Sequence, residues 1–180
     1  MYIGLISDTH GTFADDVKEF LAPVDVIWHA GDFGGGIRFA RKIAEYKPLL
    51  GVHGNVDGMD IRSIYPRFQQ FECEGLRVLM THIGLMKGAY WGFSPRQFPY
   101  DTVAKALIDT YHPDLFIYGH THIPQVVRDP AYGMLLMNPG ACGFEGPREV
   151  PRMALRFHIV NGKIEGLEKC AFTRRLISSS

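Results

Sequence analysis

The first 53 residues alternate short apolar runs with amphipathic segments, and this alternation constrains the fold more than any other feature of the sequence. Residues 2–7, 26–30 and 49–53 are apolar runs of strand length. Between them, 12–22 and 37–46 carry apolar residues at helical spacing. This strand–helix–strand order predicts a largely parallel sheet with functional side chains at the carboxyl ends of its strands.

The rest of the sequence is richer in strand-like segments. Glu74-Gly75 and Asn161-Gly162 are turn dipeptides between apolar segments, and 101–111 has helical spacing. Strands are expected at 68–72, 76–81, 115–118, 134–137, 154–160 and 163–169. An α/β half followed by a β-rich half predicts a mixed α/β (α+β) fold, in which two packed β-sheets form a sandwich flanked by helices. With 180 residues, the chain is expected to be one domain over residues 1–180.

Composition and charge exclude several classes of protein. No apolar run approaches the roughly 18 residues of a membrane span, and the start MYIGLISDTHG lacks the features of a secretory signal, so a cytoplasmic protein is expected. Lys+Arg and Asp+Glu are balanced at 19 each, which does not favour a nucleic-acid partner. Cys73, Cys142 and Cys170 are scattered, which argues against disulfides and a thiolate zinc site.

A long connection between His82 and Tyr100 contains several aromatic residues. We expect this segment to be either a lid or an interaction surface, and a homo-oligomer formed through exposed apolar loops is one alternative. The aromatic residues concerned are Tyr90, Trp91, Phe93 and Phe98.

Polar residues that can bind metals follow five of the expected strands. They are the seven nitrogen or oxygen donors Asp8, His10, Asp32, Asn55, His82, His120 and His122. Carboxylate, amide and imidazole without thiolate suit divalent ions such as Mn²⁺, Fe²⁺ or Zn²⁺. Two metal ions that share one carboxylate would use all seven donors.

Each of these signals also has an ordinary structural interpretation when taken alone. An Asp-x-His after a strand is often a turn or a helix cap, and Gly31-Asp32 and Gly54-Asn55 are common turn dipeptides. His120 and His122 could be a half-buried pair on opposite sides of an extended segment. Five such turns in this order, each after an apolar strand, favour a metal site.

The five blocks resemble those of the calcineurin-like metallophosphoesterases. The blocks are Asp8-Thr9-His10, Gly31-Asp32, Gly54-Asn55-Val56-Asp57, Thr81-His82 and Gly119-His120-Thr121-His122. The match runs from residue 3 to about residue 140 and includes Asn138-Pro139-Gly140. The short length is similar to the small prokaryotic phosphodiesterase branch, to which the phosphoesterase-like subunit of the retromer coat is related.

The resemblance implies a ligand set and an activity. It implies a first metal ion on Asp8, His10, Asp32 and His122. It implies a second on Asp32, Asn55, His82 and His120, so that Asp32 bridges the two. Asp32, Asn55 and His82 are the implied catalytic residues. The implied cofactors are two divalent ions, Mn²⁺ in first place, with Fe, Ni or Zn as alternatives.

The implied activity is hydrolysis of a small phosphodiester or nucleotide-like substrate by a metal-bridging hydroxide. A phosphomonoesterase, a nuclease and a non-catalytic protein-binding scaffold are the alternatives. No basic tract supports the nuclease. The complete donor set favours catalysis over a scaffold.

The sequence departs from the family pattern at two positions. Many members have histidine where this chain has Val56, and relatives commonly have Gly-His where it has Ile83-Gly84. Valine cannot transfer a proton, so slow turnover and a preference for good leaving groups are expected.

The remaining histidines and three other polar residues are assigned more simply. His53 either faces the phosphate or ends its strand without a chemical role. Structural roles are expected for His29, His112 and His158. Asn138 and Asp57 are candidates for fixing ligand imidazoles from behind. Arg96 either contacts a phosphate or is a solvated surface charge.

Overall fold

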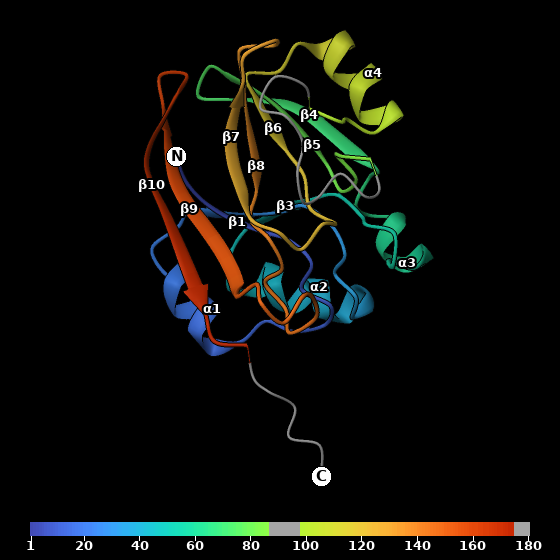
Figure 1. Ribbon diagram of the computed structural model, residues 1–180. Helices are drawn as coiled ribbons and strands as arrows, with labels where there is room; N and C mark the ends of the chain where they lie inside the picture. The colour runs from blue at the N-terminus through green and yellow to red at the C-terminus, as the bar shows by residue number, and fades with distance from the viewer. Residues whose placement is uncertain (87–97, 175–180) are drawn as a thin grey trace.

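The computed structural model describes residues 1–86 and 98–174, which form two packed five-stranded sheets with helices on their outer faces (Figure 1). The first sheet has the order β10-β9-β1-β2-β3. Its strands are β1 (Tyr2–Ile6), β2 (Val26–His29), β3 (Leu49–Gly51), β9 (Arg152–Val160) and β10 (Lys163–Phe172). The first three are parallel, whereas β9 and β10 form an antiparallel hairpin that extends the sheet beside β1.

The second sheet has the order β4-β5-β6-β8-β7. Its strands are β4 (Phe68–Cys73), β5 (Leu76–Thr81), β6 (Leu115–Ile117), β7 (Gln125–Asp129) and β8 (Met134–Asn138). The central strands β5, β6 and β8 are parallel, and β4 and β7 close the two edges in the antiparallel direction. Parallel strands therefore occupy part of both sheets.

Helices cover the outer faces of the sheets. The helices α1 (Asp15–Leu21) and α2 (Gly36–Tyr46) pack on the first sheet, and α4 (Thr102–Tyr111) packs on the second (Figure 1). The short helix α3 (Met59–Arg62) follows β3. Side chains alternate along β1, so that Ile3 and Leu5 enter the core between the sheets while Ile6 faces α1 and α2.

Trp28 is the largest side chain buried between the two sheets. It is 2% exposed and contacts Phe71 and Phe157 edge to face, with ring centroids 5.1 and 6.1 Å away. Burial of a side chain this large contributes on the order of 3 kcal/mol. The apolar runs that define the strands in the sequence are thus the same residues that join the sheets.

The predicted fold is confirmed, with two elements that the sequence did not reveal. The strand β7 is an edge strand with only two apolar residues, Val126 and Val127, and the helix α3 has a single turn. Neither is long enough to show a clear hydrophobic period. The third strand ends at Gly51 rather than at His53, because the chain turns there toward α3.

The aromatic segment is described only in part. Phe98 is 7% exposed and packs in the cluster beneath α4, so it does not contribute to an exposed surface. Tyr90, Trp91, Phe93 and Arg96 lie outside the described residues, and so does Ser178-Ser179-Ser180. None of the helices in the described ranges has the length and apolar character needed to cross a membrane.

The carboxyl ends of parallel strands from both sheets meet at one edge of the sandwich. At this edge the Asp8 amide donates to Gly31 O at 2.9 Å, which joins the loops after β1 and β2. The Gly119 amide donates to His82 O at 3.0 Å and joins the ends of β5 and β6. His82 Nδ1 lies 2.8 Å from Ala30 O, so a side-chain hydrogen bond connects the two sheets. All five sequence blocks therefore lie around one site.

Candidate metal centre

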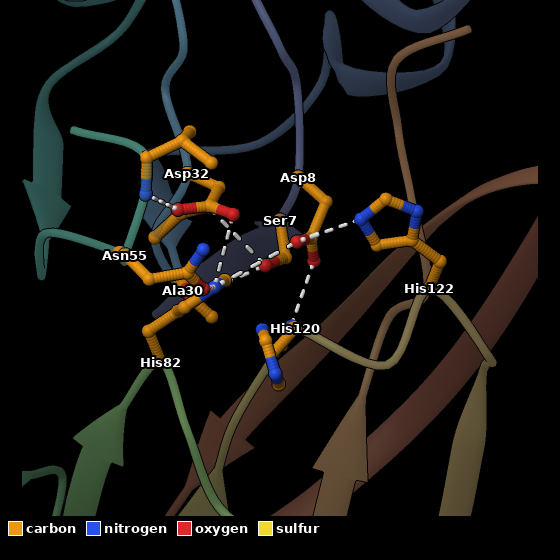
Figure 2. Close-up of polar contacts among 12 residues, drawn as sticks. Ser7, Asp8, Ala30, Asp32, Asn55, His82, His120 and His122 are labelled. Atoms are coloured by element: carbon orange, nitrogen blue, oxygen red, sulfur yellow. Dashed lines mark hydrogen bonds and ion pairs between the residues drawn. The ribbon is translucent and has the colours of Figure 1, made fainter. Parts of the chain in front are cut away.

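The seven expected ligands lie together at this edge, and the six labelled in Figure 2 point toward a common space. Their donor atoms form two adjoining groups, Asp8 with His10 and His122, and Asp32 with His82 and His120. Within each group the atoms lie within 4.8 Å of one another. Asn55 joins the second group, because its Oδ1 is 3.2 Å from His82 Nε2.

The first group is built around the buried carboxylate of Asp8. Its Oδ1 is 3.2 Å from His122 Nε2 and 4.0 Å from His10 Nε2, and the two imidazole nitrogens are 3.1 Å apart. The Asp8 Oδ1 is fully buried, yet the His122 contact does not have hydrogen-bond geometry, and no other donor within residues 1–86 and 98–174 reaches this atom. A buried carboxylate oxygen without a donor is costly, and a cation would satisfy it. The residues present thus fit a divalent ion.

The second group is built around His82. Its Nε2 lies 3.2 Å from Asp32 Oδ2 and 3.9 Å from Asp8 Oδ1, so this imidazole also links the two groups. Nδ1 donates to the carbonyl oxygen of Ala30, so loss of the Nε2 proton leaves a neutral ring whose Nε2 lone pair faces the site. The rotamer and tautomer of His82 are therefore fixed from behind.

The electrostatics of the site favour cations. Burial alone would lower the pKa of His82, but the hydrogen bond to Asp32 and the charges of Asp8 and Asp32 outweigh it and raise the pKa to about 9. Burial would raise the pKa of Asp32, but the hydrogen bond and charge of His82 lower it to about 2. The pKa of Asp8 is also lowered, since the adjacent His122 and the charge of His82 outweigh its burial. Both carboxylates are therefore ionised at neutral pH.

Two nearby polar residues support the backbone of the site. Asp57 accepts hydrogen bonds from the amides of Phe33, Gly34 and Gly54, at 2.8–3.2 Å. Asn138 donates to Gly119 O and to Thr121 Oγ1 at 3.1 and 2.9 Å. These hydrogen bonds go to loops that carry expected ligands, so Asp57 and Asn138 support the backbone of the site. The sequence had suggested that they contact the imidazoles of the ligands instead.

His29 is structural, as expected, but it also supports the site. Its Nδ1 accepts from the Gly31 amide at 3.1 Å and its Nε2 lies 2.9 Å from Thr9 Oγ1, so it holds the loops after β1 and β2 together. Burial lowers its pKa to about 4, which keeps the ring neutral. His158 stacks on Tyr2, with ring centroids 3.9 Å apart, and His112 is the C-cap of α4.

Sequence reasoning missed Glu145, whose Oε2 lies 3.6 Å from His10 Nδ1. This distance places a carboxylate behind one expected ligand. Glu145 belongs to the loop between β8 and β9, and no pattern in the sequence connects it with residue 10. The Gly143 amide brings this loop to the site by donating to Asp8 O at 3.0 Å.

Val56 and Ile83, the two departures from the family pattern, both lie beside the site and are exposed by 51% and 36%. The Val56 amide donates to Asp32 Oδ1 at 3.0 Å, so the backbone at this position supports the site. Its side chain offers no proton.

Comparison of the fold gives several similar structures. An archaeal phosphodiesterase is 21% identical, with a TM-score of 0.67 over 96% of this chain and 100% of that one. An uncharacterised Streptococcus pneumoniae protein, described as a predicted phosphoesterase, is 18% identical, with a TM-score of 0.64 over 94% and 88%. Vps29 of Entamoeba histolytica, solved as a complex with Zn²⁺, is 16% identical, with a TM-score of 0.62 over 96% and 100%.

A search of curated proteins gives no match. The family model for the calcineurin-like phosphoesterase superfamily domain matches residues 1–162, which is most of the chain. This match supports a metal-dependent hydrolase that acts on phosphoester bonds. The chain belongs to the calcineurin-like phosphoesterase superfamily.

Proposed function

We propose that this protein is a phosphodiesterase that depends on two divalent metal ions and hydrolyses a small phosphodiester. The observation that carries the proposal is the pair of adjoining donor groups around the unsatisfied Oδ1 of Asp8. Asp8, His10 and His122 would hold one ion, and Asn55, His82 and His120 the other. Asp32 would be shared. Mn²⁺ is the first candidate, with Fe, Ni and Zn as alternatives.

The donor set leaves the loaded site positively charged. Only Asp8 and Asp32 are anionic among the seven donors, so two divalent ions exceed the charge of their ligands. When bound, such ions neutralise the oxygens of the phosphate and lower the pKa of a water molecule. An anionic ester is therefore attracted to the site, and the neutral amide of Asn55 adds no repulsion.

The side chains position the reacting groups rather than exchange protons. His82 is held by Ala30 O, and Asp32 by the amide of Val56 at 3.0 Å. Val56, which stands where many relatives have histidine, cannot protonate the departing alcohol. The proposed enzyme therefore acts best on esters whose leaving group needs no proton.

Space beside the metal centre favours a diester over a monoester. A cavity of about 330 Å³ adjoins Asn55 and His82. A phosphodiester carries an organic group on each side of the phosphorus, and this cavity has room for one of them. The similarity to an archaeal phosphodiesterase supports the same choice.

The test is hydrolysis by chelator-treated protein before and after addition of Mn²⁺. Bis(p-nitrophenyl) phosphate is expected to be hydrolysed faster than p-nitrophenyl phosphate. Asp32→Asn is expected to reduce kcat/KM at least about 100-fold. The exposed His158, away from the site, provides the control His158→Asn, which is expected to retain wild-type activity. If neither ester were hydrolysed in a metal-dependent reaction, the proposal would be refuted.

The similarity to Vps29 favours a protein-binding scaffold as the second candidate. Asp32→Asn separates the two candidates, because it removes the carboxylate that the two ions would share without altering the outer surface. If this variant lost metal and kept its biological role in cells, the scaffold would be supported.

A further inference from the structure

We infer that the cavity beside Asn55 and His82 is a subsite for a second phosphate group, carried by one of the two alcohols of the substrate. The inference rests on the proposed phosphodiesterase function and specifies its substrate class. The substrate would be a phosphodiester with an organic body and a further phosphate, as in a nucleotide that bears a second phosphate on its sugar.

The position of the cavity is the first argument. Its wall combines the loop and helix of residues 53–67, the end of β5 and the start of α4. Asn55 and His82 belong to this wall and also to the second donor group. A molecule in the cavity therefore touches the metal centre, so the cavity and the centre can hold two parts of one substrate.

The charges of the cavity are the second argument. Arg62 and Arg67 line it, and Asp101 is the acidic residue that lines it. The carboxylate of Asp101 accepts hydrogen bonds from the amides of Val103 and Ala104, at 2.9 and 3.4 Å, and so caps α4. Its charge is thus engaged by the start of the helix. The cavity is left with two guanidinium groups, which suit a phosphate.

The two arginines have different roles. Arg62 Nε donates to Asp57 O at 2.7 Å and its Nη2 to Asn55 O at 3.3 Å, so it holds the loop that carries a metal ligand. The guanidinium of Arg67 has no hydrogen bond or ion pair within residues 1–86 and 98–174, and the residue is exposed. Arg67 is therefore the arginine whose binding capacity is free.

The apolar part of the cavity is the third argument. Ile83 and Val103 line it and remain 36% and 38% exposed. Exposed branched side chains beside two guanidinium groups suit an organic ring that bears an anion. A volume of about 330 Å³ matches the lower end of small-molecule sites. Inorganic phosphate alone would leave this apolar wall uncovered.

Two probes with the same scissile bond test the inference. The first is the p-nitrophenyl ester of thymidine 5′-phosphate, and the second is the same ester with an additional 3′-phosphate. Both release p-nitrophenolate, so any difference in kcat/KM arises from the extra phosphate. The Mn²⁺-loaded wild type is expected to prefer the second probe by roughly tenfold, as one charge-assisted hydrogen bond allows.

Variants of Arg67 identify the origin of that preference. Arg67→Gln is expected to reduce it to about twofold or less, and Arg67→Lys, which keeps the charge, to retain part of it. Arg41 is also exposed but lies on α2 and does not line the cavity, so Arg41→Gln serves as the matched control. Thermal unfolding of each variant establishes that it is folded.

A binding measurement gives a readout that does not depend on turnover. Chelator-treated protein is titrated with thymidine 3′,5′-bisphosphate and with thymidine 5′-phosphate at low ionic strength, because screening weakens exposed contacts. The bisphosphate is expected to bind more tightly in wild type and in Arg41→Gln, and the advantage is expected to be lost in Arg67→Gln.

The outcomes separate the two proposals. Metal-dependent hydrolysis of both probes at equal kcat/KM overturns the subsite and leaves the phosphodiesterase function standing. If neither probe is hydrolysed, the phosphodiesterase function is overturned, and the titrations with thymidine 3′,5′-bisphosphate and thymidine 5′-phosphate then decide whether the cavity binds the second phosphate. A preference that survives in Arg67→Gln assigns the second phosphate to another surface and also overturns the subsite.

Discussion

Replacement of Gly54 by alanine tests whether the position of Asp32 determines metal binding. A Cβ atom at residue 54 would lie 1.9 Å from Asp32 Oδ1 and 2.4 Å from Asp32 N. Ordinary contact begins at 3.4 Å, so the carboxylate must retreat by about 1.5 Å and the backbone by about 1 Å. Gly54 does not have a positive φ, so alanine adds no backbone strain and the effect is steric.

The expected effect on metal binding and activity is large. Ligand distances in metal sites hold to about 0.2 Å, and a misplacement of about 1 Å can reduce a rate about 100-fold. We expect Gly54→Ala to weaken binding of the metal ion held by Asp32 at least about 10-fold and to reduce kcat/KM about 100-fold. Calorimetric titration of chelator-treated protein with Mn²⁺ and hydrolysis of bis(p-nitrophenyl) phosphate measure the two effects.

Gly58 provides a control in the same loop. Its φ is −78°, which suits alanine, and among the described residues its Cβ would meet only Asp60 Oδ1, at 3.0 Å, the end of an exposed side chain. Gly58→Ala is expected to bind Mn²⁺ as wild type does. If Gly54→Ala bound two equivalents of Mn²⁺ with wild-type affinity, the assignment of Asp32 as a shared ligand would be wrong.

Three further predictions concern stability and proton transfer. Because the folded-state pKa of His29 is about 4 rather than 6.5, the unfolded chain binds more protons between these values. The free energy of unfolding should fall by roughly 3 kcal/mol as the pH drops through this window, and less in His29→Gln, as measured with urea on chelator-treated protein. Asp16→Asn, which leaves the buried Arg152 without its carboxylate at 2.6 Å, should cost about 2 kcal/mol in the same assay, whereas Asp15→Asn should change little. Val56→His should accelerate hydrolysis of esters with alkyl leaving groups about tenfold or more in steady-state assays, and leave p-nitrophenyl esters nearly unchanged.

The sequence predicted the layers of the fold because its strands are apolar on the faces that pack. Ile3 and Leu5 enter the core between the sheets, and Ile6 enters the layer beneath α1 and α2. The strand β7 did not follow this rule because an edge strand buries little, and its residues Val126 and Val127 are only partly buried. With only these two apolar residues, β7 gave no readable strand pattern.

The composition of the candidate site was readable because parallel strands end at the same edge of a sheet. Each block could be placed there from its own strand, with no knowledge of the contacts between blocks. Glu145 and the cavity beside Asn55 could not be predicted in this way. Their neighbours come from segments far apart in the sequence, such as Arg67 and Val103, which only the folded chain brings together.

The backbone of the candidate site has an unusual conformation at most of the expected ligands. Eight non-glycine residues among those described have positive φ, and three of them lie at hairpin turns or a helix end, where this conformation is common. The other five are expected ligands with φ between 45° and 68°, namely Asp8, His10, Asp32, His120 and His122.

Each left-handed residue other than glycine costs on the order of 1 kcal/mol. Glycine would follow the same path without that cost, as Gly11, Gly31 and Gly34 do in the same loops. Stability therefore does not explain histidine and aspartate at these five positions. The proposed metal binding would explain them, because carboxylates and imidazoles at these points complete the two donor groups. A scaffold that used only the outer surface of this fold would have no physical reason to retain that strain.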